Sequence, residues 1–169
     1  MYTNKLSGEI PCSIANLSQL SILGLADNKL EERIPDSLEN CKRLLVIDLE
    51  FNNLTRTIPE QIFGLSSLSI GLFLYNKLSG GVTATLSSFQ VLEFLSLAGN
   101  HFEGTIHESL NQLRGIQFLD LSRNNSSGQI PKVLEELTLL QNLNLSYNMF
   151  EGEVPIDGLF KNITPSVPF

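Results

Sequence analysis

Residues 143–155 read LNLSYNMFEGEVP, and this short run contains the repeat that organises the whole chain. Leu143 and Leu145 alternate with polar residues, a pattern that is typical of a short strand with one buried face. Asn148 follows three positions after Leu145, and a Val-Pro pair ends the run. The same order recurs along the chain at a constant step of 24 in the numbering. Asparagine marks it at Asn4, Asn28, Asn52, Asn76, Asn100, Asn124 and Asn148.

Several other columns of residues keep the same phase. Apolar residues recur two positions after most of these asparagines, and isoleucine or valine recurs six positions after them. A fixed period of this length predicts a solenoid, because one short strand cannot bury its apolar face without a neighbouring coil. The amide of the recurrent asparagine can satisfy buried backbone groups at the turn after the strand. We therefore predict a structural asparagine ladder of Asn28, Asn52, Asn76, Asn100, Asn124 and Asn148.

The second half of each unit predicts the outer side of the stack. A Gly-x-Ile-Pro run is followed by two apolar residues three positions apart, as in Ile14 with Leu17 and Leu134 with Leu137. Proline stops a regular helix from continuing through it, and a spacing of three suits a 3₁₀ or short helical turn. The predicted fold is an α/β solenoid, a right-handed superhelix with a parallel concave sheet and short convex helices.

We expect one domain, residues 1–169, built from repeats of this one period. Its predicted parts are a partial repeat (1–19), full repeats (20–43, 44–67, 68–91, 92–115 and 116–139), a last repeat (140–163) and an irregular tail (164–169).

The pattern LxxLxLxxNxLxGxIPxxLxxL resembles the plant-specific class of leucine-rich repeat over residues 4–157. The run 143–155, with Gly158, Phe160 and Asn162 after it, is similar to the last repeat of receptor-like kinase ectodomains, most of all in the immune-receptor subfamily. The resemblance implies an extracellular recognition module in plant defence or development signalling, with a peptide or microbial ligand on the concave face. It also implies a possible co-receptor ectodomain at the C-terminal repeats. The intact parent would lie at the plasma membrane and carry an intracellular Ser/Thr kinase.

Two other interpretations stay open. One is a free-standing secreted leucine-rich-repeat protein, such as a binder that resembles polygalacturonase inhibitors. The other is a truncated receptor copy without function. The start of the chain has no apolar run before a small-residue cleavage site, and no stretch approaches the roughly 18 apolar residues of a membrane helix. We therefore expect neither a signal peptide nor a membrane segment in this chain.

Composition excludes several function classes. The net charge is −7 with no basic cluster, which argues against nucleic acid and anionic membranes as partners. No phosphate-binding loop, metal-ligand cluster or nucleophile motif appears, so we expect no enzyme, no cofactor and no metal. Asp48 and Glu50 resemble a glycosidase pair only superficially, because nothing nearby is expected to bury one carboxyl and raise its pKa.

Some positions depart from the pattern. Glu32 and Arg56 replace the glycine, so two turns are expected to form without a residue free to take a positive φ. Thr83 and His107 replace the proline. Ser126 replaces a core leucine, and a buried hydroxyl without a partner would cost about 1–3 kcal/mol.

The third repeat allows two registers. In strict phase Gly71 and Phe73 point inward, whereas a slip by one residue buries Leu72 and Leu74. We favour the slip, because burying two leucines is worth on the order of 3–5 kcal/mol.

Solvent-facing positions on the concave strands are the candidate ligand-binding residues. An apolar column of Val46, Ile70, Phe94 and Phe118 either supplies aromatic anchors or packs against the edge of the sheet. Acidic residues on this face would favour a ligand with basic side chains. The candidate set is Asp48, Glu50, Phe51, Leu72, Tyr75, Phe94, Phe118, Asp120, Arg123 and Tyr147.

N-glycosylation sequons are frequent in the chain. They begin at Asn16, Asn53, Asn124, Asn125, Asn144 and Asn162. Asn124 belongs to the predicted ladder, and a glycan on Asn144 would cover the concave surface. We therefore expect Asn16 and Asn53 to be the glycosylated residues.

Overall fold

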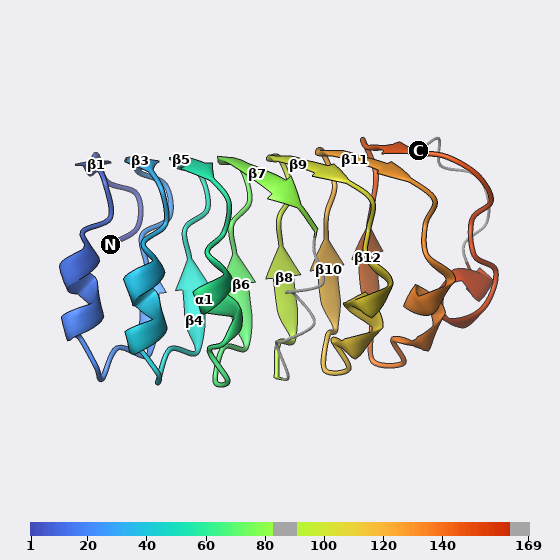
Figure 1. The fold of residues 1–169 in the computed structure, drawn as a ribbon, viewed down its shortest axis with the longest axis horizontal. Helices are drawn as coiled ribbons and strands as arrows, with labels where there is room; N and C mark the ends of the chain where they lie inside the picture. Colours follow the sequence, from blue (N-terminus) through green and yellow to red (C-terminus); the bar gives the residue numbers. More distant parts are fainter. Residues whose placement is uncertain (83–90, 163–169) are drawn as a thin grey trace.

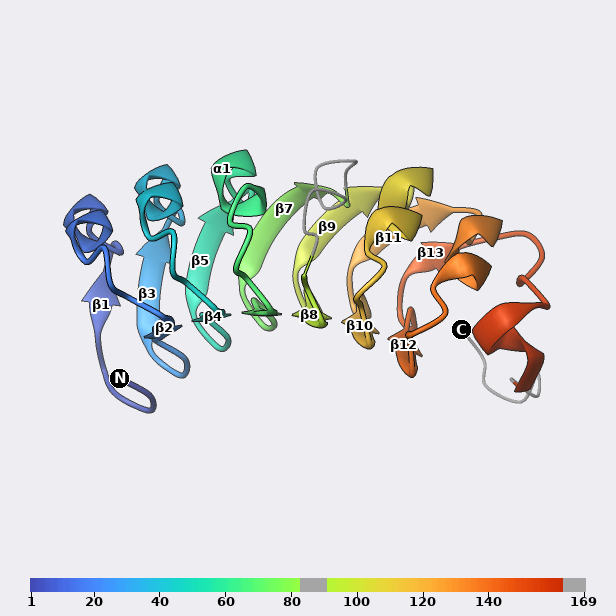
Figure 2. The same ribbon diagram turned by 90° about the horizontal axis from the view of Figure 1, so that it is seen from below.

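The computed structural model describes residues 1–82 and 91–162, which form a stack of coils (Figure 1) that is curved when seen from below (Figure 2). A parallel sheet with one short strand per coil lines the inner face of the curve. Its strands are β2 (Ile22–Gly24), β4 (Val46–Asp48), β6 (Ile70–Leu72), β8 (Phe94–Ser96), β10 (Phe118–Asp120) and β12 (Asn142–Asn144). Neighbouring strands pair residues one period apart, for example Leu23 with Ile47 and Leu95 with Leu119. The predicted solenoid with a parallel concave sheet is confirmed.

A second parallel sheet, which the repeat pattern did not predict, runs along one side of the stack. Its strands are β1 (Ser7–Gly8), β3 (Lys29–Glu32), β5 (Asn53–Arg56), β7 (Lys77–Gly81), β9 (His101–Gly104), β11 (Asn125–Gly128) and β13 (Met149–Phe150). Most of these strands bury one side chain, as β3 buries only Leu30, so no alternating pattern is long enough to reveal them. Glu31 pairs with Asn53 and not with Thr55, which holds the equivalent position in the next coil, so these strands are staggered along the stack.

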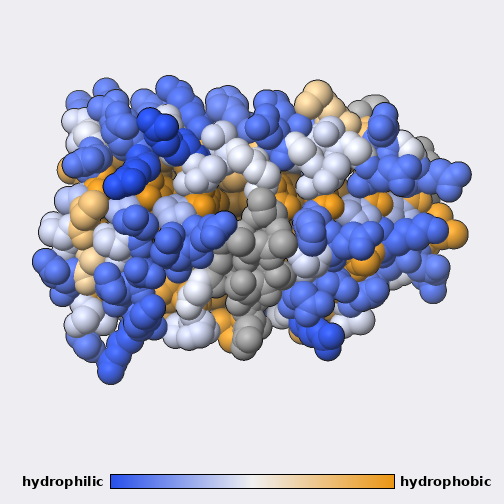
Figure 3. Space-filling view, viewed as in Figure 1, coloured by the Kyte–Doolittle hydropathy of each residue, from blue (hydrophilic) through white to orange (hydrophobic). Residues whose placement is uncertain are grey.

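The short convex helices are confirmed. The 3₁₀ helices are η1 (Cys12–Asn16), η2 (Asp36–Asn40), η4 (Glu108–Gln112), η5 (Lys132–Glu136) and η6 (Gly158–Asn162), and one α-helical turn is α1 (Glu60–Phe63). Figure 2 shows them on the outer side of the arc. The face seen in Figure 3 is largely hydrophilic, with apolar patches between rows of polar side chains. Before η4, the His107 side chain replaces the usual proline and accepts a hydrogen bond from the Ser109 backbone N–H at 3.1 Å. Thr83, the other proline substitution, lies outside the described residues.

The asparagine side chains join each coil to the preceding one. Each Oδ1 accepts a hydrogen bond from a backbone N–H in the coil before, at 2.9–3.1 Å. Each Nδ2 donates to carbonyl oxygens both of its own turn and of the coil before, as Asn100 does to Leu97 and Phe73. These contacts satisfy backbone groups that have little access to water, since Asn52, Asn76, Asn100 and Asn124 are buried.

The predicted slip in the third repeat is wrong. Gly71 pairs with Ile47 and Leu95 in strict phase, and Phe73 is buried at 1% exposure, whereas Leu72 and Leu74 stay half-buried on the concave face. The two inward residues compensate each other, because a Cβ on Gly71 would lie 3.0 Å from Phe73 Cε2. The Phe73 ring therefore fills the space that a leucine at position 71 would occupy. Asn76 also holds the phase through its bond to the Phe73 carbonyl.

The expectation for the two turns that lack glycine is also wrong. Glu32 and Arg56 adopt φ angles of 65° and 68°, in the same left-handed region as Gly104 and Gly128. Side chains with a Cβ are strained in this region by about 1–2 kcal/mol. The shape of the coil thus overrides the preference of the residue at these turns.

Replacement of Glu32 or Arg56 by glycine should therefore stabilise the protein. Relief of the strain exceeds the extra entropy of glycine in the unfolded chain, so we expect a gain of about 0.5–1 kcal/mol for each change. Glu31→Gly is the matched control and should cost about 0.5–1 kcal/mol, because Glu31 lies within β3 and is not at positive φ. Urea unfolding measures both. A loss of stability in both Glu32→Gly and Arg56→Gly would contradict the proposed backbone strain.

Ser126 lies in the core at 1% exposure, and its hydroxyl has no hydrogen-bond partner among the described residues. The expected cost of a buried hydroxyl thus applies here. Ser126→Ala should raise the free energy of unfolding by about 1 kcal/mol, since it removes the unsatisfied oxygen and little volume. Ser127→Ala, at the half-buried neighbouring position, should change it by less than about 0.5 kcal/mol. Equal shifts in the two unfolding midpoints would contradict this account.

Candidate ligand-binding surface

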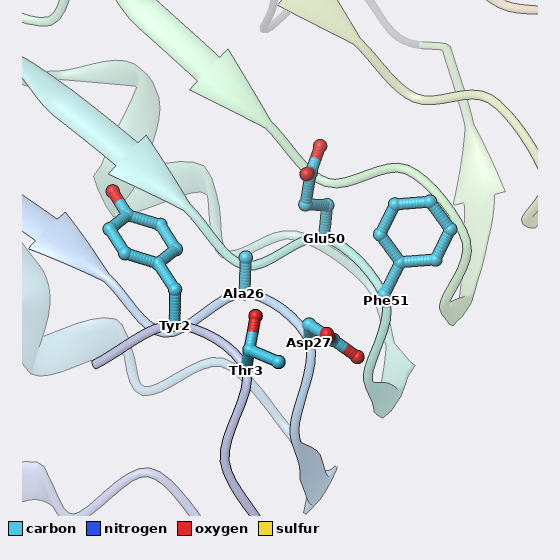
Figure 4. Close-up of a pocket in the computed structure, with 6 residues that line it drawn as sticks. All are labelled: Tyr2, Thr3, Ala26, Asp27, Glu50 and Phe51. Carbon is cyan, nitrogen blue, oxygen red and sulfur yellow. The ribbon is translucent and has the colours of Figure 1, made fainter.

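A hollow lies on the concave side, where three successive coils meet near the N-terminal end of the stack (Figure 4). Its volume is about 370 Å³, and it is lined by Tyr2, Thr3, Ala26, Asp27, Glu50 and Phe51. These residues occupy the last two positions before the ladder asparagine in each coil. Asp27 and Phe51 have φ angles of 54° and 52°, so the turn directs their side chains away from the strand direction. Ala26 is buried and has a side chain too small to fill the hollow.

The two predicted acidic residues, Asp48 on β4 and Glu50 in the turn after it, differ in their exposure to solvent. Asp48 was expected to face solvent but is only 8% exposed, because Tyr2 lies across the neighbouring strand at Gly24. Glu50 is half-buried and lines the hollow. Asp27, which was not in the candidate set, lies in the same hollow and is exposed. Its signal in the sequence was its position next to ladder residue Asn28, the position that Phe51 holds in the next coil.

The expectation that nothing would perturb these carboxyls is wrong. Burial raises the pKa of Asp48 above its ordinary value, opposed by a hydrogen bond from the Glu50 N–H, the positive N-terminus and the Tyr2 hydroxyl. Burial also raises the pKa of Glu50, and the negative charge of Asp48 raises it further. The two groups follow each other along one short segment, so their charges repel across little water. This end of the concave face is therefore an environment in which negative charge is poorly compensated.

Aromatic side chains form a stack beside the hollow. The rings of Phe51 and Tyr75 lie 4.9 Å apart between centroids, with an angle of 17° between their planes. Tyr75 in turn lies over Gly99, where a Cβ would come within 2.6 Å of Tyr75 Cδ1. Both rings remain exposed to solvent. The stack therefore offers an apolar surface next to two carboxylates.

The other candidates form two separate groups. Phe94 and Phe118 stack with centroids 4.0 Å apart at 2°, and they are half-buried at the entrance of β8 and β10. Further along, the Arg123 guanidinium lies 4.2 Å from the centre of the Tyr147 ring. Asp120 accepts a hydrogen bond from the Ser122 N–H at 2.9 Å, so part of its role is to hold the end of its strand. Leu72 lies half-buried between the acidic hollow and the Phe94–Phe118 pair.

Asn16 and Asn53, the predicted glycosylation sites, are both exposed. Asn16 ends η1 on the convex side, and Asn53 begins β5 in the second sheet. Cys41 is buried in the core and Cys12 is exposed. In the part of the chain that the structure describes, no cluster of His, Cys, Asp and Glu could hold a metal ion.

The repeats of this chain match a known protein family. The family model described as Leucine Rich Repeat matches residues 19–41, 43–65, 91–113, 115–137 and 139–161, which is more than half of the chain. The chain belongs to the leucine-rich-repeat family. The unmatched segment between these repeats contains Gly71, where the leucine-rich-repeat pattern loses its inward leucine. No curated protein matches this chain.

Plant receptors are among the solved structures with similar leucine-rich repeats. The Arabidopsis receptor kinase HAESA, in complex with the peptide hormone IDA and the co-receptor SERK1, has a TM-score of 0.90 and 32% identity over 99% of this chain and 28% of its own. The plant peptide hormone receptor RGFR1, in complex with RGF2, has a TM-score of 0.85 and 37% identity over 87% of this chain and 24% of its own. PEPR1, in complex with AtPEP1, has a TM-score of 0.86 and 35% identity over 89% of this chain and 21% of its own.

This chain therefore spans only 21–28% of the length of those receptor chains. Within the two described ranges, no helix has the length and apolar character required to cross a membrane.

Proposed function

We propose that this chain is part of the extracellular domain of a plant receptor-like kinase and that its concave face binds a peptide. Its role is recognition and not catalysis, and it serves defence or development signalling at the outer side of the plasma membrane. The likeness to three plant receptors supports this function, since HAESA is bound to a peptide hormone in its complex and RGFR1 is a peptide hormone receptor.

The hollow at Glu50 is the observation that carries the proposal. Asp27 and Glu50 place two carboxylates in it, and the Phe51 ring forms one wall. Across residues 1–82 and 91–162, the single ion pair joins Lys161 and Asp157, so no salt bridge neutralises these carboxylates. A lysine or arginine side chain of a ligand would meet both the carboxylates and the face of an aromatic ring. The peptide that we propose therefore carries a basic residue at this point.

The remaining concave side chains suit the rest of such a peptide. Leu72 and the stacked Phe94 and Phe118 give an apolar surface beyond the hollow, and the cation–π pair of Arg123 and Tyr147 lies further toward the C-terminal coils. We propose that a co-receptor ectodomain contacts these last coils, where Tyr147, Met149 and Ile156 are exposed. Glycans on Asn16 and Asn53 would leave this surface free.

A display library of random short peptides, selected against the immobilised chain, tests this function. We expect the selected peptides to be enriched in lysine and arginine. The double variant Asp27→Asn, Glu50→Gln should bind such a peptide at least about tenfold more weakly, because a hydrogen bond to a charged group contributes about 1.5–3 kcal/mol. Since the pKa of Glu50 is raised, acidification should weaken binding at a higher pH than for an ordinary glutamate.

Glu103→Gln is the matched control, because Glu103 is exposed on β9 in the second sheet and should not affect binding. Selected peptides whose affinity is unchanged in the double variant would remove the hollow from the proposal. A selection that yields no peptide sensitive to any concave substitution would contradict concave-face binding itself.

A further inference from the structure

Two overlapping sequons compete at the start of β11. Asn124-Asn125-Ser126 places a glycan on Asn124, and Asn125-Ser126-Ser127 places it on Asn125. The sequence gives both asparagines the same chemistry. The structure separates them, because one belongs to the buried ladder and the other faces solvent.

The amide of Asn124 is fully engaged inside the stack. Its Nδ2 donates to the carbonyl oxygens of Leu97, Leu121 and Ser122 at 3.0, 3.1 and 3.0 Å. Its Oδ1 accepts from the Phe102 N–H at 3.0 Å, and the residue is 7% exposed. A sugar on Nδ2 would remove donors from these carbonyls and would have no space in the core. A chain modified at Asn124 thus cannot close its ladder at this coil.

Asn125 is exposed on β11, at the same place in its coil that Asn53 holds on β5. We propose that Asn125 is an N-glycosylation site and that its glycan, with one on Asn53, covers the outward face of the second sheet. In the transfer step, Nδ2 of Asn125 loses one hydrogen and bonds to the anomeric carbon of a lipid-linked oligosaccharide pyrophosphate. The bond between that carbon and the pyrophosphate breaks, and the lipid pyrophosphate leaves as the proton is released.

The positions of the two glycans define which faces stay accessible. Asn53 and Asn125 are three coils apart, or about 14 Å at ordinary strand spacing, and both lie on the side of the stack rather than in the concave sheet. A bulky, solvated glycan at each blocks protein docking along β5–β11. Partners are thereby directed to the concave face, the convex helices, the opposite edge and the ends of the stack. This inference rests on the extracellular location proposed above.

The test uses the full chain, secreted from plant cells behind a cleavable signal. Enzymatic release of N-glycans in H₂¹⁸O converts each glycosylated asparagine to ¹⁸O-labelled aspartate. Trypsin cleaves after Arg123 and Lys132, so one peptide holds both candidate asparagines, and fragmentation distinguishes them. A sample without the releasing enzyme corrects for spontaneous deamidation.

Two conservative variants isolate the two sequons. Ser126→Ala destroys the sequon of Asn124 and keeps that of Asn125, whereas Ser127→Ala does the opposite. We expect the label on Asn125 in the wild type and in Ser126→Ala, and its loss in Ser127→Ala.

Label on Asn124 in folded, secreted protein, or an unlabelled Asn125 beside a labelled Asn53, would overturn the inference. If no sequon carried label in secreted protein, the inference would fail together with the two other glycosylation sites. The peptide-binding function is measured separately and would stand.

Discussion

Alanine in place of Asn100 should lower the free energy of unfolding by about 4 kcal/mol, since several buried backbone groups each lose a partner at about 1–3 kcal/mol. The change removes a bond from the Leu78 N–H and bonds to the carbonyl oxygens of Phe73, Leu97 and Ala98, at 3.0–3.2 Å. The loss falls in the middle of the stack, so the coils on its two sides should also couple less strongly.

Urea unfolding followed by circular dichroism measures this loss. Asn125→Ala is the matched control, because Asn125 is exposed one position after a ladder residue and its removal should cost less than about 0.5 kcal/mol. Protein made in bacteria avoids any effect of glycans on the comparison. An Asn100→Ala variant as stable as the control would show that the ladder contributes nothing to the stack.

Phe73→Ala should cost about 3–5 kcal/mol, as large-to-small changes of buried aromatic residues do. Phe73 is buried, and Gly71 in the same coil has no side chain that could move into the space left by the ring. Leu74→Ala is the paired variant and should cost no more than about 1 kcal/mol, since Leu74 is half-buried on the concave face. Thermal and urea unfolding of the two variants give the comparison.

The order of these two effects tests the register of the third repeat. The slipped register buries Leu72 and Leu74 and turns Phe73 toward solvent, so it requires the opposite order. A Leu74→Ala variant clearly less stable than Phe73→Ala would therefore contradict the strict phase.

Much of this fold could be predicted from its period. The recurring asparagine indicated the phase of the coils, and the apolar pairs after the prolines indicated the convex helices. The predicted register of the third repeat was wrong because buried apolar area alone favours two leucines over a glycine and a phenylalanine. The sequence pattern holds no information on how Phe73 fills the space over Gly71, which depends on the shape of two neighbouring residues. The prediction for Glu32 and Arg56 was wrong for a similar reason. The packed coil imposes a positive φ on two residues that rarely adopt one.

The candidate surface was predicted only in outline. The alternation of strand residues placed Phe94 and Phe118 in one column, and the structure adds their stacking. Asp48 was misplaced because its burial depends on Tyr2, a residue two coils earlier that lies over Gly24. The hollow formed by Asp27, Glu50 and Phe51 joins residues from different coils, and no single repeat contains the pattern. Local periodicity defines columns, whereas concavity arises between them.

Residue-resolved hydrogen exchange measures directly how well the backbone amides of each coil are protected. The backbone N–H groups of Leu54, Leu78 and Phe102 donate to the ladder side chains of Asn76, Asn100 and Asn124 and lie in the core. We expect these three amides to exchange slowly and at similar rates, with protection that recurs once in every coil and includes the third repeat. Fast exchange at Leu78 beside slow exchange at Leu54 and Phe102 would show that the coils do not form one continuous ladder, and the concave surface built on it would lose its basis.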